Sequence, residues 1–160
     1  MKLRLLTLAA MFAALSAIGA FVKIPVGINS AALDTVPALV SAAFLPPIYV
    51  GAASMIGHLS SSLYAGFPLG PLHLIIAAEM FLILFVYTKL HQAGRSILKW
   101  VFFIVANSLL ATLPFYWIIS PAFFVGALPG ITIATVLNAG IAIMVSPVVE
   151  RVMERVKTHA

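Results

Sequence analysis

The chain is a succession of long apolar segments separated by short connections that contain proline and glycine. A helix that crosses a bilayer needs about 20 mainly apolar residues, because the hydrocarbon core is about 30 Å thick. By this criterion the sequence predicts spans at residues 3–22, 31–45, 48–64, 72–90, 97–119 and 129–149. We therefore expect an all-α membrane protein, a compact bundle of six transmembrane helices that forms one domain over residues 1–160.

Breaks in the apolar pattern give further expectations. The second segment, 31–45, is short and ends at Pro46-Pro47, so the sequence leaves open whether it crosses the bilayer fully. Turn-rich connections are predicted at residues 23–30, 66–71 and 120–130. Pro114 is predicted to kink the fifth span, and Gly140 to mark close packing in the sixth.

Composition strengthens the membrane interpretation. Hydrophobic residues make up 63% of the chain and charged residues only 8%, with a mean hydropathy of +1.17, which excludes a water-soluble domain. The absence of cysteine excludes disulfides, thiolate chemistry and cysteine-ligated metals. We expect the first apolar segment to remain in the mature protein, because its removal would take a helix from an already minimal bundle.

Basic residues predict the orientation. With both termini in the cytoplasm, eight of the nine Lys and Arg residues lie inside and Lys23 alone lies outside. The eight are Lys2, Arg4, Lys89, Arg95, Lys99, Arg151, Arg155 and Lys157. This asymmetry favours an even number of spans, and the charged residues from Glu150 onward are expected to continue the last helix into the cytoplasm.

Two acids lie within apolar segments and require an explanation. Asp34 is predicted about one turn below the outer surface and Glu79 about two turns below it. A charged side chain at a helix centre costs roughly 2.5–3.5 kcal/mol on insertion scales, so such residues normally face protein, water or a ligand. Glu79 is therefore a candidate for ligand or ion binding, or else a protonated or histidine-paired structural carboxyl.

Other polar and aromatic residues are predicted at similar depths in the outer half. Together they would line a largely apolar small-molecule cavity, for which the candidate residues are Asp34, His58, Phe67, His73, Glu79, Asn107 and Asn138. Structural roles remain open for several of them. Asn107 and Asn138 could form interhelical hydrogen bonds, His58 could bond a neighbouring helix, and Asp34 could pair with Lys23 or cap the second helix.

Small residues recur at four-residue spacing in the first span. Ala9 and Ala13, and Ala10 and Ala14, form a flat stripe that lets another backbone approach closely. The stripe alone does not distinguish packing within the bundle from docking of a partner.

These features together resemble the substrate-binding S component of an energy-coupling factor (ECF) vitamin transporter. The resemblance rests on the six-span layout, the alanine-rich segment 5–15, Lys23-Ile24-Pro25, Ala32-Leu33-Asp34, Gly57-His58 and the segment 66–73. It is strongest to the group that takes up α-ribazole and related cobalamin precursors.

The resemblance implies a function and a set of partners. An S component would capture a vitamin or vitamin precursor outside a prokaryotic cytoplasmic membrane and associate with a transmembrane coupling subunit and two cytoplasmic ATPases. Ala9, Ala10, Ala13 and Ala14 would form the docking surface. The chain carries no G-x-x-x-x-G-K-[ST] motif, so the ATPases would hydrolyse ATP.

Other classes of function are less well supported by the sequence. No cofactor is expected, and no metal, because the His and acidic residues lack a ligand spacing and the N-terminus lacks the histidine set of metal-specific S components. An intramembrane protease is disfavoured by the lack of G-x-S-x-G and of an evident Ser/His pair. The alternative that remains is a stand-alone ion- or proton-coupled carrier with Glu79 as its proton site.

Overall fold

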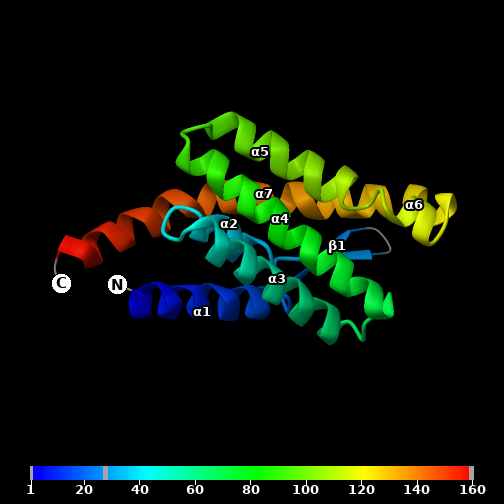
Figure 1. Cartoon of the computed structure of the whole chain (residues 1–160), viewed down its shortest axis with the longest axis horizontal. Coiled ribbons are helices and arrows are strands. Elements are labelled where there is room, and N and C mark those ends of the chain that lie inside the picture. Colours follow the sequence, from blue (N-terminus) through cyan, green and yellow to red (C-terminus); the bar gives the residue numbers. More distant parts are fainter. Residues whose placement is uncertain (1, 27–28, 159–160) are drawn as a thin grey trace.

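Helices form most of the chain, and α1, α5 and α7 run along the long axis of the molecule (Figure 1). The computed structural model describes residues 2–26 and 29–158. In chain order the elements are α1 (Lys2–Gly19), β1 (Lys23–Val26), β2 (Asn29–Ala32), α2 (Val36–Ser41), α3 (Pro47–Tyr64), the 3-10 turn η1 (Gly70–Leu72), α4 (His73–Gln92), α5 (Ser96–Val105), the π-helical turn η2 (Ala106–Leu110), α6 (Phe115–Ile118) and α7 (Pro121–Thr158).

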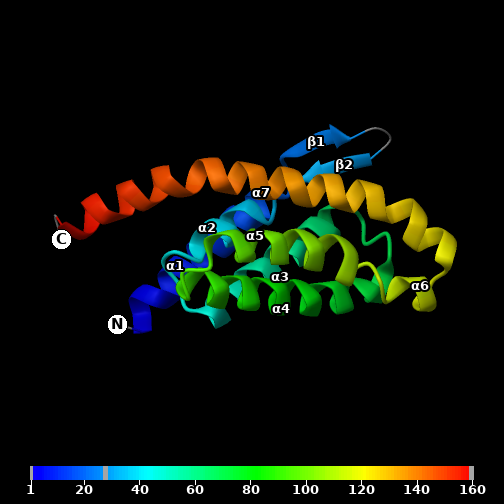
Figure 2. The same ribbon diagram turned by 90° about the horizontal axis from the view of Figure 1, so that it is seen from above.

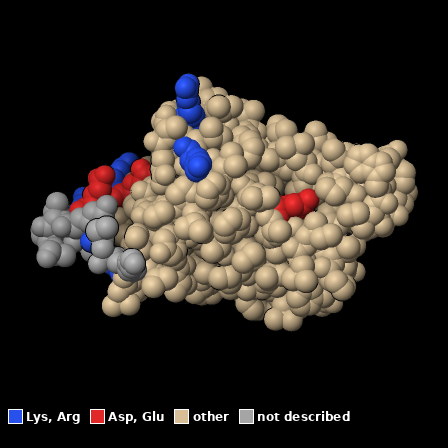
Figure 3. Space-filling view, in the orientation of Figure 1, with Lys and Arg blue, Asp and Glu red and all other residues tan. Residues whose placement is uncertain are grey.

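The arrangement confirms an all-α membrane bundle. Three stretches are long and apolar enough to cross a membrane, namely Gly70–Gln92, Ser96–Ile118 and Pro121–Arg155, and Leu3–Gly19 is a shorter apolar helix. Both termini lie at the same end of the molecule (Figure 1). On the face shown in Figure 3, the Lys and Arg side chains gather toward that end. The cytoplasmic location of the termini stays a prediction.

The second predicted span, 31–45, does not form a full-length helix. Only α2 is helical there, with six residues, and its buried positions are Ala38, Leu39, Val40 and Ser41. Pro37 opens this helix, and Pro46-Pro47 begins the next one. Such irregular backbone is tolerated at membrane depth because it is buried in protein and satisfied there, as when Ser41 Oγ donates to the Ala38 carbonyl at 2.8 Å.

A β-hairpin replaces the predicted connection at 23–30. Strands β1 and β2 pair antiparallel, with Lys23 opposite Ala32. The Leu33 N–H extends the pairing by donating to the Val22 carbonyl at 3.1 Å. The hairpin lies beside α7 in the half of the molecule away from the termini (Figure 2).

The fifth predicted span is interrupted as Pro114 indicated, but the interruption begins earlier. After α5 the backbone widens into η2, where the Ala111 N–H donates to the Ala106 carbonyl at 2.8 Å. A new short helix, α6, follows Pro114. A π-helical turn rotates the side chains that follow it around the helix axis, so it changes which of them face α7.

The connection predicted at 120–130 is wrong, because α7 begins at Pro121 and passes through Pro129. The Ser120 side chain caps the helix by accepting from the Phe123 N–H at 3.1 Å, and Pro121 suits a first helical position. Pro129 and Pro147 both lie inside α7, which is visibly curved (Figure 2). The helix continues to Thr158, as the charged C-terminal residues indicated.

Close packing occurs in α3 rather than at Gly140. A methyl group on Gly140 would meet nothing within 4 Å, so the prediction for this residue is wrong. A methyl group on Gly57 would lie 2.7 Å from Ser16 Cβ, which shows that α1 and α3 approach closely there. The apolar core, in which Leu39, Leu84 and Phe103 are fully buried, fills one half of the bundle. A cavity lies in the other half.

Candidate functional site

A cavity of about 250 Å³ lies in the half of the bundle away from the termini. The segment after β2, together with α3, α4, η2, α6 and α7, contributes to its wall. Its lining residues are Ala32, Asp34, Thr35, His58, Leu69, Ile76, Met80, Asn107, Ala111, Thr112, Phe115, Phe123, Ile131, Ala134, Thr135 and Asn138. Apolar side chains predominate and a few polar groups converge on the same space, which is the composition of a small-molecule site.

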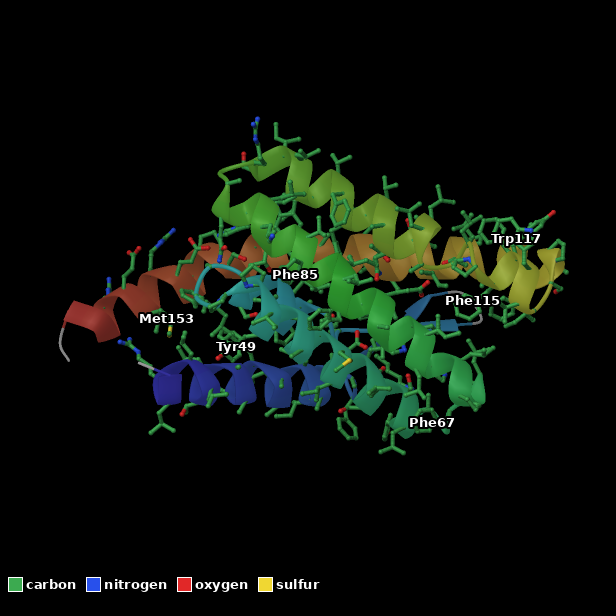
Figure 4. All side chains as sticks on the ribbon, in the orientation of Figure 1. Tyr49, Phe67, Phe85, Phe115, Trp117 and Met153 are labelled. Carbon is green, nitrogen blue, oxygen red and sulfur yellow. The ribbon has the colours of Figure 1, made fainter. Side chains whose placement is uncertain are left out.

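Aromatic rings close the side of the cavity formed by α6 and α7. Phe115 is buried and packs its ring 6.2 Å from that of Phe123, measured between centroids. Figure 4 shows Phe115 on the side of α6 that faces α4 and the hairpin, with Trp117 on the opposite side. Trp117 is 71% exposed, so it is placed as a lipid-facing or interfacial anchor rather than a cavity residue.

The structure brings together four of the seven candidate residues. Asp34, His58, Asn107 and Asn138 all line the cavity, although they come from segments far apart in the chain. The other three candidates, His73, Phe67 and Glu79, are not among the lining residues, and each lies in a different environment.

Asp34 directly follows the hairpin. Its Oδ1 accepts a hydrogen bond from Thr35 Oγ1 at 3.2 Å. Thr35, not Asp34, is the residue that precedes α2, and its side chain does not cap that helix. Lys23 lies over the Tyr64 ring, with Nζ 5.0 Å from the ring centroid. The carboxyl group of Asp34 therefore belongs to the cavity wall rather than to a helix cap.

His58 is tied to His73 by a small polar network. Ser62 Oγ donates to the His58 carbonyl at 2.8 Å and lies 2.9 Å from His73 Nδ1. The Leu69 N–H donates to His73 Nε2 at 3.4 Å, so His73 carries its proton on Nδ1. His58 Nε2 lies 3.2 Å from that Nδ1 and 3.2 Å from Ser62 Oγ.

His73 and Phe67 pack against each other beside His58. His73 is buried at the start of α4, and Phe67 packs edge-on against its ring with 5.6 Å between centroids. Phe67 has a φ of 50°, an unusual left-handed conformation for a residue other than glycine. Both residues therefore act on the cavity through His58.

Glu79 is half-buried on α4, one residue before the lining residue Met80. Within the described part of the chain, its Oε2 atom is buried and has no hydrogen-bond partner. The predicted histidine partner is not placed beside it, because His73 bonds to α3 instead. Glu79 thus remains an unexplained carboxyl group at the margin of the site.

Asn107 makes the interhelical bond that the sequence left open, whereas Asn138 bonds to a strand and to its own helix; both line the cavity. Asn107 Nδ2 donates to Thr135 Oγ1 on α7 at 2.7 Å. Asn138 Nδ2 donates to the Ala32 carbonyl of β2 at 2.8 Å and to the Ala134 carbonyl at 2.9 Å. The structural and ligand-binding interpretations are therefore compatible for these residues.

The sequence reasoning missed several lining residues. Among them are Thr112, Phe115, Phe123, Ile131 and Thr135, and the expected connection at 120–130 kept Phe123 from being placed on a helix. The available signal was Ser120 followed by Pro121, a helix-start pattern that would have placed Phe123 on α7.

The alanine stripe of α1 divides between two faces. Ala13 is 7% exposed and Ala9 packs partly against the core, so these two face the bundle. Ala10 and Ala14 are exposed. Thr7 lies on the same outward face, with its hydroxyl donating to the Leu3 carbonyl of the same helix at 3.0 Å. A small-residue surface is therefore available at Ala10 and Ala14.

The chemistry of the cavity is that of binding. Among the described residues, no group of three or more His, Cys, Asp and Glu side chains could hold a metal ion. The lining residues include one acid and one histidine but neither Lys nor Arg. The available interactions are hydrogen bonds to amide, carboxyl and imidazole groups within apolar walls.

Comparisons with known proteins agree with this geometry. The family model described as "ECF transporter, substrate-specific component" matches residues 4–151. A solved S component of a bacterial ECF transporter superposes with a TM-score of 0.73 at 13% identity, covering 96% of this chain and 99% of that one. At this identity the structural likeness shows the fold alone. The search of curated proteins gave no match.

Proposed function

Because the chain belongs to the family of substrate-specific components of ECF transporters, we propose that it captures a vitamin or vitamin precursor from outside the cell for ATP-driven uptake. The favoured ligand is α-ribazole or a related cobalamin precursor. As a member of this family the chain is a non-catalytic subunit in a membrane, and its partners are a transmembrane coupling subunit and ATPases.

The observation that carries the proposal is the position of the cavity. It lies in the half of the bundle away from both termini and the clustered basic side chains, so cytoplasmic termini would make it accessible from outside. Asp34, His58, Asn107 and Asn138 would supply the polar contacts there. His73 and Phe67 would position His58, and Glu79 would lie beside the site.

Docking of the coupling subunit is assigned to the outward face of α1. Ala10 and Ala14 are exposed at four-residue spacing, which allows close approach of another helix in lipid. Ala9 and Ala13 support that face from within, since they pack toward the bundle. The docking surface and the cavity therefore lie on different parts of the molecule.

Reconstitution tests the proposal. Proteoliposomes that contain this chain with its coupling subunit and ATPases are expected to accumulate α-ribazole only when ATP is present on the ATPase side. Proteoliposomes with this chain alone serve as the control. Accumulation by the chain alone, driven by a proton gradient, would contradict the proposal and favour the carrier, for which Glu79, whose Oε2 has no partner among the described residues, would be the proton site.

A further inference from the structure

Asn138 has an unusual hydrogen-bonding state for a buried side chain. It is 4% exposed and lines the cavity from α7. Its Nδ2 group uses both hydrogens on the carbonyl oxygens of Ala32 and Ala134. Within the described part of the chain, its Oδ1 atom has no hydrogen-bond partner. A buried acceptor without a partner is costly, so it points to a donor supplied from outside the chain.

The orientation of this amide is fixed by its surroundings. Rotating it by 180° would place Oδ1 against two carbonyl oxygens at 2.8 and 2.9 Å, where no hydrogen is available. The acceptor therefore cannot be exchanged for the donor. Because one of these carbonyls belongs to β2, the same side chain that lines the cavity also holds the hairpin.

A second lining residue also offers acceptor oxygens. The Asp34 carboxyl group is an acceptor, and among the described lining residues there is no Lys or Arg to neutralise an anion. An anionic ligand would lose its hydration there without a compensating cation. Apolar groups such as Ile76, Met80 and Phe115 provide contact area for a ring.

We propose that Asn138 Oδ1 is the specificity-determining acceptor of the site, and that it selects a non-anionic ring compound that donates an N–H or O–H group. This inference rests on the proposed function, since it assigns the ligand class of the same cavity. It places carboxylate-bearing and phosphorylated vitamins outside the substrate class.

The first experiment compares ligands on the full-length protein in detergent. Thermal-shift titrations use α-ribazole, riboflavin and thiamine as non-anionic donors, and biotin, pantothenate and the 5′-phosphate of α-ribazole as anions. At least one non-anionic compound should stabilise the protein, and anions should bind about a hundredfold more weakly or not at all. Preferential binding of an anion would overturn the inference while leaving the proposed function intact. Binding of none of the six would contradict both.

The second experiment isolates Asn138. Asn138→Leu should weaken the compound that binds by about tenfold or more, because a buried acceptor is lost. Thr112→Val is the matched control, since Thr112 lines the same cavity but spends its hydroxyl hydrogen on the Ser108 carbonyl at 2.6 Å. Equal effects of the two substitutions would overturn the inference.

A ligand-side measurement keeps the test decisive if Asn138→Leu does not fold. Analogues of the bound compound are prepared in which each donor hydrogen in turn is replaced by methyl. One of them should bind the unsubstituted protein about tenfold more weakly, because it cannot donate to Oδ1. If no such replacement weakens binding, the inference is wrong.

Discussion

The close approach of α1 and α3 at Gly57 makes a quantitative prediction about stability. In Gly57→Ala the new methyl carbon would lie 2.7 Å from Ser16 Cβ, 0.7 Å short of the 3.4 Å at which ordinary contact begins. Ser16 is fully buried and cannot move into solvent. Overpacking of this kind costs about 1–3 kcal/mol of the free energy of unfolding.

A second effect of the same substitution has the opposite sign. Alanine is favoured over glycine within a helix by about 1 kcal/mol, which partly offsets the overpacking at Gly57. Gly140→Ala in α7 is the matched control, because its methyl group would meet nothing within 4 Å and only the helix preference changes. The difference between the two variants removes the helix term and leaves about 1–3 kcal/mol.

Thermal unfolding of the ligand-free protein in detergent measures this difference. Gly57→Ala should lower the unfolding midpoint relative to Gly140→Ala, which should raise it. Ser16→Gly should restore part of the loss when it is combined with Gly57→Ala, because it removes the carbon that the new methyl group meets. Equal stabilisation by both alanine variants, without coupling to Ser16, would show that the helices do not pack this closely.

Three further predictions concern docking, binding and capping. Ala14→Trp, on the exposed face of α1, should abolish ATP-driven uptake in proteoliposomes while ligand affinity is retained, whereas Ala13→Trp, 7% exposed, should instead lower the unfolding midpoint. Asp34→Asn should weaken ligand binding by about tenfold in a titration, and Glu79→Gln by less than about twofold, because Asp34 alone of the two lines the cavity. Ser120→Ala should cost about 1 kcal/mol of stability in thermal unfolding, since the Phe123 N–H loses its partner.

Much of the membrane architecture could be predicted from the sequence because bilayer thickness sets the length of apolar segments. The apolar stretches around α4 and α5 were placed within a few residues, and Pro114 indicated the interruption before α6. The short second segment also signalled its own irregularity through Pro46-Pro47. These features depend on local composition and on the lack of a proline N–H, which are properties of single segments.

The site was predicted only in part, because depth along a helix is simpler to infer than direction around it. Asp34, His58, Asn107 and Asn138 were found from polarity and depth, and the structure places all four on the cavity wall. Glu79 has a similar depth but does not line the cavity. The π-helical turn at 106–110 and the curvature of α7 decide which side chains face inward, and the π-helical turn has no clear sequence signature.

The sequence by itself determined that this protein is a membrane bundle with eight of its nine Lys and Arg residues on one side, because hydrophobic length and charge asymmetry are sums over the chain. The tertiary structure decided how each small or polar residue is used. It turned Ala13 inward and left Ala14 exposed. It also bonded the Asn138 amide to the hairpin and left its Oδ1 without a partner among the described residues. Those outcomes depend on which distant segments meet, and no local pattern specifies that.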